Sequence, residues 1–250
     1  MARVLCISSQ TVYGPVGNSA AVPALQAEGH EVLQIPTVIL SNHPGHGKPA
    51  GQSTPAVLLE DMFEALNRIK AFHGLNAVMT GYFTSAAQVI AAAKQITALK
   101  LADESLHVLV DPVIGDHGAL YVPIDVAEAI RDHLLPLATM TTPNLFELTW
   151  LTGIETVVDA VKKLHVAETI VTSVPEKADA LATILHVDGN EYTHIMPRHA
   201  KVTHGTGDFL AGCYLAARLK MAPASAFERT MKRLQSAIQK SAGYAVLNIT

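Results

Sequence analysis

Apolar segments of strand length alternate with longer segments of helical period along almost the whole chain. This alternation is typical of an α/β protein in which helices cover a mostly parallel central sheet. No internal repeat or linker interrupts the pattern, so we predict a single domain over residues 1–250. The predicted strands are 4–9, 31–40, 76–82, 106–113, 137–142 and 168–173, followed by a hairpin over 182–196 that turns at Asp188 and Gly189. The predicted helices are 18–28, 56–72, 85–101, 125–135, 145–151, 158–164, 207–220 and 224–247.

The composition narrows the class of protein. Of 250 residues, 49% are hydrophobic and 16% are charged, which excludes a disordered chain. The formal net charge of −4 gives no bulk attraction to nucleic acid or to an anionic membrane. The two cysteines lie far apart, and neither a signal peptide nor an apolar run of 18 residues is visible. We therefore predict a soluble, cytoplasmic protein without nucleic-acid or membrane partners.

A long loop interrupts the otherwise short connections. Residues 41–55 hold three glycines and three prolines, and loops of this length usually cover or bind a ligand. The loop also contains His43 and His46. We do not expect these two histidines to bind a metal, because the sequence offers them no obvious third ligand.

Polar residues follow five of the predicted strands. They are Ser9, residues 80–82, Asp111, residues 142–144 and residues 172–173. Each one alone is adequately explained as a turn or a helix cap. Ligands of open parallel sheets bind beyond the carboxyl ends of the strands, so five such ends together predict a binding site.

The sharpest local motif is HGTGDFLAG at 204–212, where Gly205 and Gly207 flank Thr206 before an apolar helix. Glycines let successive backbone N–H groups approach an anion, and the start of a helix adds partial positive charge. Asp208 would then act as a base or orient a nucleophile. The motif alone is equally consistent with Asp208 as a favourable residue at a helix N-terminus.

Dispersed acidic residues form a second signal. The segment DPVIGD supplies Asp111 and Asp116, and NLFEL supplies Asn144 and Glu147. Mg²⁺ prefers such oxygen ligands and keeps several waters, so a few carboxylates suffice when a phosphate completes its shell. The alternative is that Asp116 lies in a turn and Glu147 on a solvated helical face.

Several motifs together carry a family resemblance. They are, in chain order, ISSQTVYGPVGNSAA (7–21), VILSNHPGHGKPAGQ (38–52), TGY (80–82), DPVIGDHGALYVP (111–123), TPNLFELTWLTG (142–153), TIVTS (169–173) and GTGD (205–208). With these motifs in this order, the chain resembles the pyridoxal kinases of the ribokinase-like superfamily. GTGD marks only the superfamily, whereas the motifs at 7–21 and 38–52 point more narrowly to pyridoxal kinases. The resemblance implies a three-layer α/β/α sandwich with a mostly parallel central sheet.

The resemblance implies that the reaction is ATP-dependent phosphorylation of the 5′-hydroxymethyl group of pyridoxal. Asp208 would be the catalytic base, and residues 205–207 would form the anion hole. Ser9 would hydrogen-bond the pyridine ring, Tyr82 would pack beside it, and His43 would lie on the loop that covers it.

The resemblance also implies a set of nucleotide and metal ligands. Mg²⁺ would be ordered by three acidic side chains, Asp111, Asp116 and Glu147. ATP would be contacted by Asp111, Asn144, Thr172, Ser173 and Tyr121. A monovalent cation such as K⁺ and a homodimer are further features that the resemblance implies.

One departure from the family stands out, because Pro44 occupies a position that is commonly Thr. A hydrogen bond to the substrate would then be missing. Two alternatives also remain. One is a kinase of the same superfamily that acts on hydroxymethylpyrimidine or another small alcohol, and the other is a binder of pyridoxal phosphate without catalysis.

Overall fold

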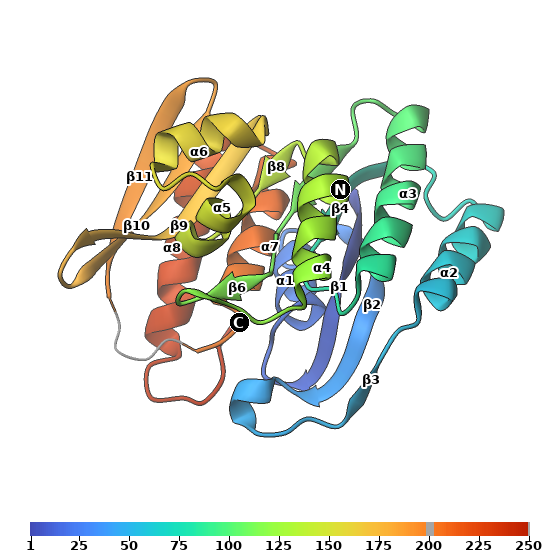
Figure 1. The fold of residues 1–250 in the computed structure, drawn as a ribbon, viewed down its shortest axis with the longest axis horizontal. Helices are drawn as coiled ribbons and strands as arrows, with labels where there is room; N and C mark the ends of the chain where they lie inside the picture. Colours follow the sequence, from blue (N-terminus) through green and yellow to red (C-terminus); the bar gives the residue numbers. More distant parts are fainter. Residues whose placement is uncertain (199–202, 250) are drawn as a thin grey trace.

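A mixed nine-stranded sheet runs through the molecule in the order β11-β10-β9-β8-β5-β4-β1-β2-β3 (Figure 1). The computed structural model describes residues 1–198 and 203–249. The neighbouring strands β9, β8, β5, β4, β1 and β2 pair in parallel. At the two edges of the sheet, β3 pairs antiparallel with β2, and β10 pairs antiparallel with β9 and β11. The strands are β1 Arg3–Tyr13, β2 Glu31–Asn42, β3 Gly51–Ser53, β4 Leu75–Thr80, β5 His107–Val110, β8 Met140–Thr141, β9 Glu168–Lys177, β10 Ala180–Val187 and β11 Asn190–Pro197. A separate small hairpin consists of β6 Gly115–Asp116 and β7 Ala119–Leu120.

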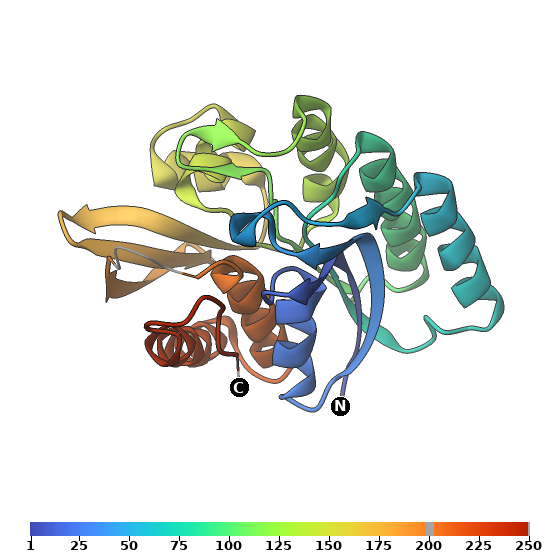
Figure 2. The same ribbon diagram turned by 90° about the horizontal axis from the view of Figure 1, so that it is seen from below.

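Helices cover both faces of the sheet, as Figure 2 shows. Helices α1, α7 and α8 lie on one side, and α2 to α6 lie on the other. The predicted three-layer α/β/α sandwich with a mostly parallel central sheet is therefore confirmed. The helices are α1 Asn18–Gln26, α2 Ala56–Arg68, α3 Ala86–Ala102, α4 Ile124–Ala129, α5 Leu145–Thr152, α6 Val157–Leu164, α7 Thr206–Arg218 and α8 Pro223–Lys240.

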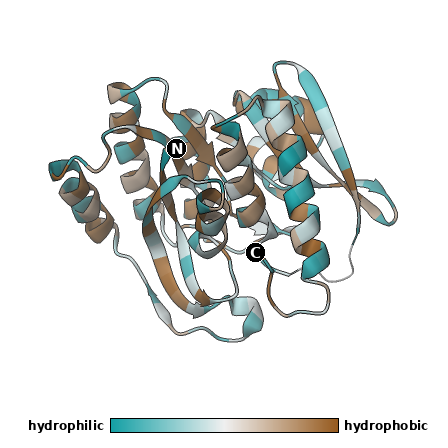
Figure 3. Ribbon diagram, turned by 180° about the vertical axis from the view of Figure 1, so that it is seen from behind, coloured by the Kyte–Doolittle hydropathy of each residue, from teal (hydrophilic) through white to brown (hydrophobic). Residues whose placement is uncertain are grey.

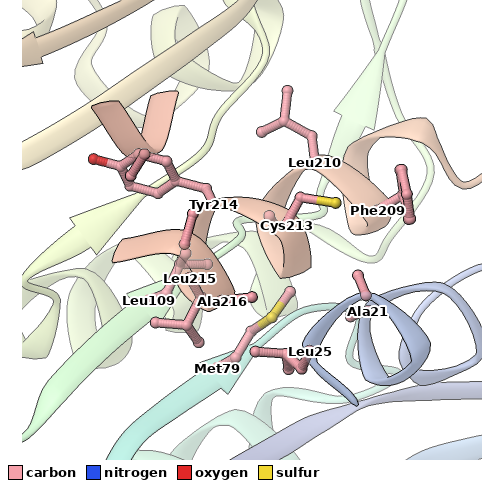
Figure 4. Close-up of a cluster of buried hydrophobic side chains, with 14 of the residues drawn as sticks. Ala21, Leu25, Met79, Leu109, Phe209, Leu210, Cys213, Tyr214, Leu215 and Ala216 are labelled. Carbon is pink, nitrogen blue, oxygen red and sulfur yellow. The ribbon is translucent and has the colours of Figure 1, made fainter. Parts of the chain in front are cut away.

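Helix α7 lies in the core of the first layer. Its residues from Phe209 to Ala217 are all buried, which is the pattern of a helix enclosed by neighbours on every side. In Figure 4, α7 side chains meet Ala21 and Leu25 of α1 and Met79 of β4. Gly212 lets α1 approach closely, because a Cβ there would lie 2.8 Å from the Cα of Ala21. This packing fixes the position of the GTGD segment at the start of α7.

The colouring of Figure 3 shows hydrophobic residues along the central strands and hydrophilic residues on outward-facing parts of the helices. This distribution explains why the inner strands read as continuous apolar runs, since both of their faces are covered.

Most predicted elements are present, although several bounds differ and the short strands β3, β6 and β7 are not among the predicted ones. Helix α4 begins one residue before the predicted 125–135 range, with Pro123 at the N-cap position, and the Asp125 carboxylate accepts a hydrogen bond from Val126 N–H. The predicted helix over 125–135 also changes to a π-turn over Ile130–Leu134. The last helix ends at Lys240 rather than near residue 247, and β1 continues beyond Ser9 to Tyr13.

No helix in residues 1–198 and 203–249 is long and apolar enough to cross a membrane.

Candidate active site

The structure brings together the five polar segments that the sequence analysis singled out. They lie on the side of the sheet towards which the parallel strands run. The N–H of Tyr82, after β4, donates to Ser8 Oγ at 3.1 Å, next to Ser9 in β1. The Thr142 hydroxyl, after β8, donates to Asp111 Oδ1 at 2.9 Å. These segments are neighbours because β1, β4, β5, β8 and β9 run parallel. Two of them are not strand ends as predicted, since β1 continues past Ser9 to Tyr13 and β9 continues past residues 172–173 to Lys177.

The start of α7 lies at this edge. Gly205 is the N-cap residue with φ of 94°, a conformation that favours glycine. A Cβ at Gly205 would overlap the carbonyl oxygen of Pro15, so the close approach also requires glycine. Helix α7 begins at Thr206, which leaves the first N–H groups of the helix without partners inside it. The N-terminal turn therefore offers backbone donors and partial positive charge to an anion.

Asp208 does not cap α7; it lies within the first turn. Its half-buried carboxylate accepts hydrogen bonds from the backbone N–H groups of Gly17 and of Asp208 itself. A Cβ built on Gly81 would lie 3.9 Å from its Oδ1, and one on Gly17 would overlap Ser9. Asp208 therefore lies beside the two segments that carry Ser9 and Tyr82. Burial raises its pKa to about 6, although the two backbone hydrogen bonds oppose this rise.

Asp111 and Glu147 form a buried acidic pair next to Asp208. Asp111 is 5% exposed, and burial together with the charge of Asp208 raises its pKa to about 8. Glu147 is 4% exposed, and burial together with the charge of Asp111 raises its pKa well above the usual value. Glu147 is therefore not on a solvated helical face, the alternative that the sequence left open.

Glu147 also has a structural role in α5. Its side chain accepts from the backbone of Asn144 at 2.8 Å and of Ile114 at 3.0 Å. The Asn144 side-chain Oδ1 accepts in return from Glu147 N–H at 2.9 Å, which completes a capping box. The Asn144 amide donates to Gly115 O at 2.8 Å, so this unit joins α5 to the β6–β7 hairpin.

The remaining predicted nucleotide and metal residues differ in their exposure and in their contacts. Asp116 is more exposed than Asp111, and its Oδ1 accepts from His117 N–H at 2.7 Å. Tyr121 is 54% exposed; partial burial and the charges of four carboxylates, led by Glu147, raise the pKa of its phenol. Thr172 forms a bridge to Asn144, and Ser173 takes a left-handed φ of 60° at an irregularity in β9. Such backbone strain is common in functional segments.

The acidic residues fit a hard divalent cation whose coordination shell phosphate oxygens would complete. In the described part of the chain, no three His, Cys, Asp or Glu side chains converge well enough to hold a metal alone. Asp111 and Glu147 are nevertheless both buried, and the charge of Asp208 raises the pKa of Asp111 while the charge of Asp111 raises the pKa of Glu147. A divalent cation would remove this repulsion, which is the chemistry expected of a shared Mg²⁺ ligand pair.

A cavity of about 680 Å³ lies elsewhere and contains none of the predicted site residues. Its lining includes Asn76, Asp103 and His107, so it opens at the amino ends of β4 and β5.

The sequence analysis missed one contact of the 41–55 loop. His204 lies beside His43, with the two ring centroids 4.0 Å apart, and the ring of His46 lies 6.2 Å from that of His204. The prediction that His43 and His46 do not bind a metal is not contradicted by this contact. His204 and His43 are distant in sequence, so only the fold could reveal this contact.

We expect Asp111→Asn to stabilise the unliganded protein at pH 8. The unfolded carboxyl has a pKa near 4 and the folded one about 8, so the folded state holds the extra proton between these values. Stability from this group is therefore present at low pH and is lost as the pH rises towards 8. Asparagine keeps the side chain neutral, and we expect a melting temperature higher by about 2–8 °C at pH 8.

Thermal unfolding of the wild type and of Asp111→Asn at pH 5 and pH 8 measures this effect. The gain should shrink at pH 5, where the native Asp111 is already protonated. An equal gain at both pH values would contradict the assigned ionisation.

The geometry can be compared with known proteins. The family model described as phosphomethylpyrimidine kinase matches residues 52–246. A pyridoxine/pyridoxal/pyridoxamine kinase of Bordetella pertussis is 35% identical over 95% of this chain and 89% of that protein. One of Bordetella bronchiseptica is 44% identical over 61% of this chain, a match that spans about half (54%) of its own length.

Among solved structures, the pyridoxal kinase from Leishmania donovani in complex with ADP and pyridoxine has a TM-score of 0.91. It is 28% identical and covers 99% of this chain and 90% of that one. The chain therefore has the fold of this structure, matches the family model over most of its length, and is similar to a relative over nearly the full length of both proteins. The chain belongs to the phosphomethylpyrimidine kinase family and, within the ribokinase-like superfamily, to the pyridoxal kinases.

Proposed function

We propose that this chain transfers the terminal phosphoryl group of ATP to the 5′-hydroxymethyl group of pyridoxal, and also of pyridoxine and pyridoxamine. The observation that carries the proposal is the position of Asp208, which lies in the first turn of α7 and beside the segments of Ser9 and Tyr82. Relatives named as kinases of these three compounds, and the neighbour described with ADP and pyridoxine, support the choice of substrates.

Asp208 takes the proton of the attacking hydroxyl in this proposal. A carboxylate with a pKa raised to about 6 by burial is ionised at neutral pH and is a stronger base than an exposed one. The backbone N–H groups at residues 205–207 stabilise charge on the transferred phosphoryl oxygens. Phosphoryl transfer needs mainly alignment and charge neutralisation, so no covalent nucleophile is required.

The proposed nucleotide site lies around the acidic side chains of Asp111 and Glu147. Asp111 and Glu147, with Asp116 nearby, would hold Mg²⁺, which neutralises phosphate charge when it is bound. The expected ATP contacts are Asp111, Asn144, Thr172, Ser173 and Tyr121. A monovalent cation such as K⁺ is part of the same proposal.

The substrate site combines Ser9, Tyr82 and His43 of the 41–55 loop. Ser9 is buried and Tyr82 is half-buried, as expected of residues around an aromatic ring. Pro44 begins a short 3-10 turn over Pro44–His46 and has no hydroxyl to offer the substrate. Recognition of the ring in this proposal therefore depends on Ser9, Tyr82 and His43.

We also propose that residues 1–250 act as one kinase domain, in the cytoplasm and as a homodimer, without nucleic-acid or membrane partners. Exposed apolar side chains near the ends of β1 and β2 support the dimer: Val12, Tyr13 and Ile39 are 85%, 51% and 52% exposed. Such a cluster is more typical of an interface than of a free surface.

A second candidate is phosphorylation of hydroxymethylpyrimidine, which the name of the matching family model favours. An ADP-release assay with pyridoxal, pyridoxine, pyridoxamine and hydroxymethylpyrimidine separates the two. We expect higher kcat/KM for the three vitamers. Preference for the pyrimidine would support the second candidate, and ligand binding without ADP release would indicate a non-catalytic binder.

A further inference from the structure

Three histidine rings meet where the 41–55 loop reaches α7. The ring centroids of His43 and His204 are 4.0 Å apart, and the planes are inclined by 32°. The ring of His46 lies edge-on to both, at 6.3 Å from His43 and 6.2 Å from His204. His204 directly precedes Gly205, the N-cap of α7, so the contact joins the loop to the proposed anion hole.

The backbone of the loop is shaped around this contact. A Cβ at Gly45 would overlap the imidazole of His204 and lie 3.0 Å from His43 Nδ1. The N–H of Gly45 donates to the same His43 nitrogen at 3.1 Å, which fixes the orientation of that ring. Glycine at this position therefore lets His204 pack directly against the turn.

The other side of the turn rests on the end of β1. His46 meets the ring of Tyr13 at 5.2 Å in an edge-to-face arrangement, and His43 N–H donates to Tyr13 O at 3.2 Å. Residues 43–46 are thus held between two parts of the chain. Tyr13 supplies one support and His204 the other.

The rings are suited to stacking as neutral groups. Burial, and then the charges of His204 and His46, lower the pKa of His43 to about 4. Burial lowers the pKa of His204 as well. At neutral pH an uncharged pair can stack without like-charge repulsion, at an energy typical of aromatic pairs.

We propose that His204 is a positioning residue for substrate binding: by stacking on His43, it holds the 41–55 loop over the substrate beside the start of α7. The inference rests on the proposed function, because His43 is placed over the substrate ring there. His204 contributes by ordering the loop, and it need not touch the reacting atoms. Because the loop is already ordered in the free protein, less conformational entropy is lost when the substrate binds, which favours affinity.

Steady-state kinetics with His204→Ala and His204→Phe test this role. Alanine removes the stack, and we expect KM for pyridoxal to rise about 3- to 10-fold while KM for ATP changes less than twofold. Phenylalanine keeps an aromatic ring and should restore most of the affinity for pyridoxal. His133→Ala, at an exposed histidine in the π-turn after α4, serves as the matched control.

Hydrogen exchange of the segment 41–53 gives a readout that does not require activity. We expect faster exchange of this segment in His204→Ala than in the wild type or in His204→Phe, with the central strands unchanged. Unchanged exchange, or an equal rise of both KM values, would overturn the proposal. If the wild type lacks kinase activity, the proposed function fails, while the exchange experiment still decides whether His204 orders the loop.

Discussion

The variant Asp208→Asn is expected to lower kcat for pyridoxal by about 10²- to 10⁴-fold, the usual contribution of a positioned general base. The amide keeps an oxygen that can accept the hydrogen bond from Gly17 N–H, so the local geometry should persist. It cannot take the proton of the substrate hydroxyl. Single-turnover measurements at saturating ATP and pyridoxal would report this step directly.

Two further measurements distinguish the loss of a catalytic base from a distortion of the whole site. The affinity for ATP, measured by calorimetry, should remain close to that of the wild type. Wild-type kcat/KM should fall as the pH drops through about 6, because burial places the pKa of Asp208 there in the unliganded protein and protonation removes the base. The residual activity of Asp208→Asn should lack this decline. Wild-type turnover in the variant would exclude Asp208 from the mechanism.

The variant Gly205→Ala is expected to produce the second large loss. Its backbone has φ of 94°, and the added methyl group would overlap the carbonyl oxygen of Pro15. Relief requires the start of α7 to move away from the Pro15 segment, which displaces the proposed anion hole. We expect kcat/KM to fall by about 10²-fold or more, and the free energy of unfolding to fall by about 2–5 kcal/mol.

Gly29→Ala provides a matched control for backbone strain. Gly29 also has a positive φ of 78°, but nothing lies within 4 Å of a Cβ built there. Its replacement should cost about 1–2 kcal/mol of stability and leave kcat/KM unchanged. Denaturant unfolding and the ADP-release assay measure both effects. Equal behaviour of the two variants would show that strain, rather than the contact with Pro15, limits Gly205.

The local elements of this protein could be predicted from sequence because their signals come from neighbouring residues. Asn144 and Glu147 are three positions apart, which is the spacing of the capping box that begins α5. The β10–β11 hairpin turns at Asp188 and Gly189, which both take positive φ values, as expected for this residue pair. The boundaries of α4 were harder, since Pro123 and Asp125 compete for the start of that helix.

The site residues divide in the same way. Sequence patterns and the family resemblance selected the polar residues after the strands, and the parallel sheet gathers their segments at one edge. Their roles in catalysis, nucleotide binding and metal binding stay predictions that the variants above can test. The contact between His43 and His204 had no sequence signal, because the two residues meet only when the loop and α7 are both in place.

By itself, the sequence determined the order of the longer strands and helices, the glycine-rich start of α7 and the family to which the chain belongs, whereas the short strands β3, β6 and β7 were not predicted. Only the tertiary structure decided that Glu147 is buried, that Asp208 lies beside Gly17 and Gly81, and that Asp111 is difficult to ionise. The physical reason is range. Helix caps and turns depend on a few adjacent residues, whereas burial and electrostatic fields depend on groups that the fold brings together from distant parts of the chain.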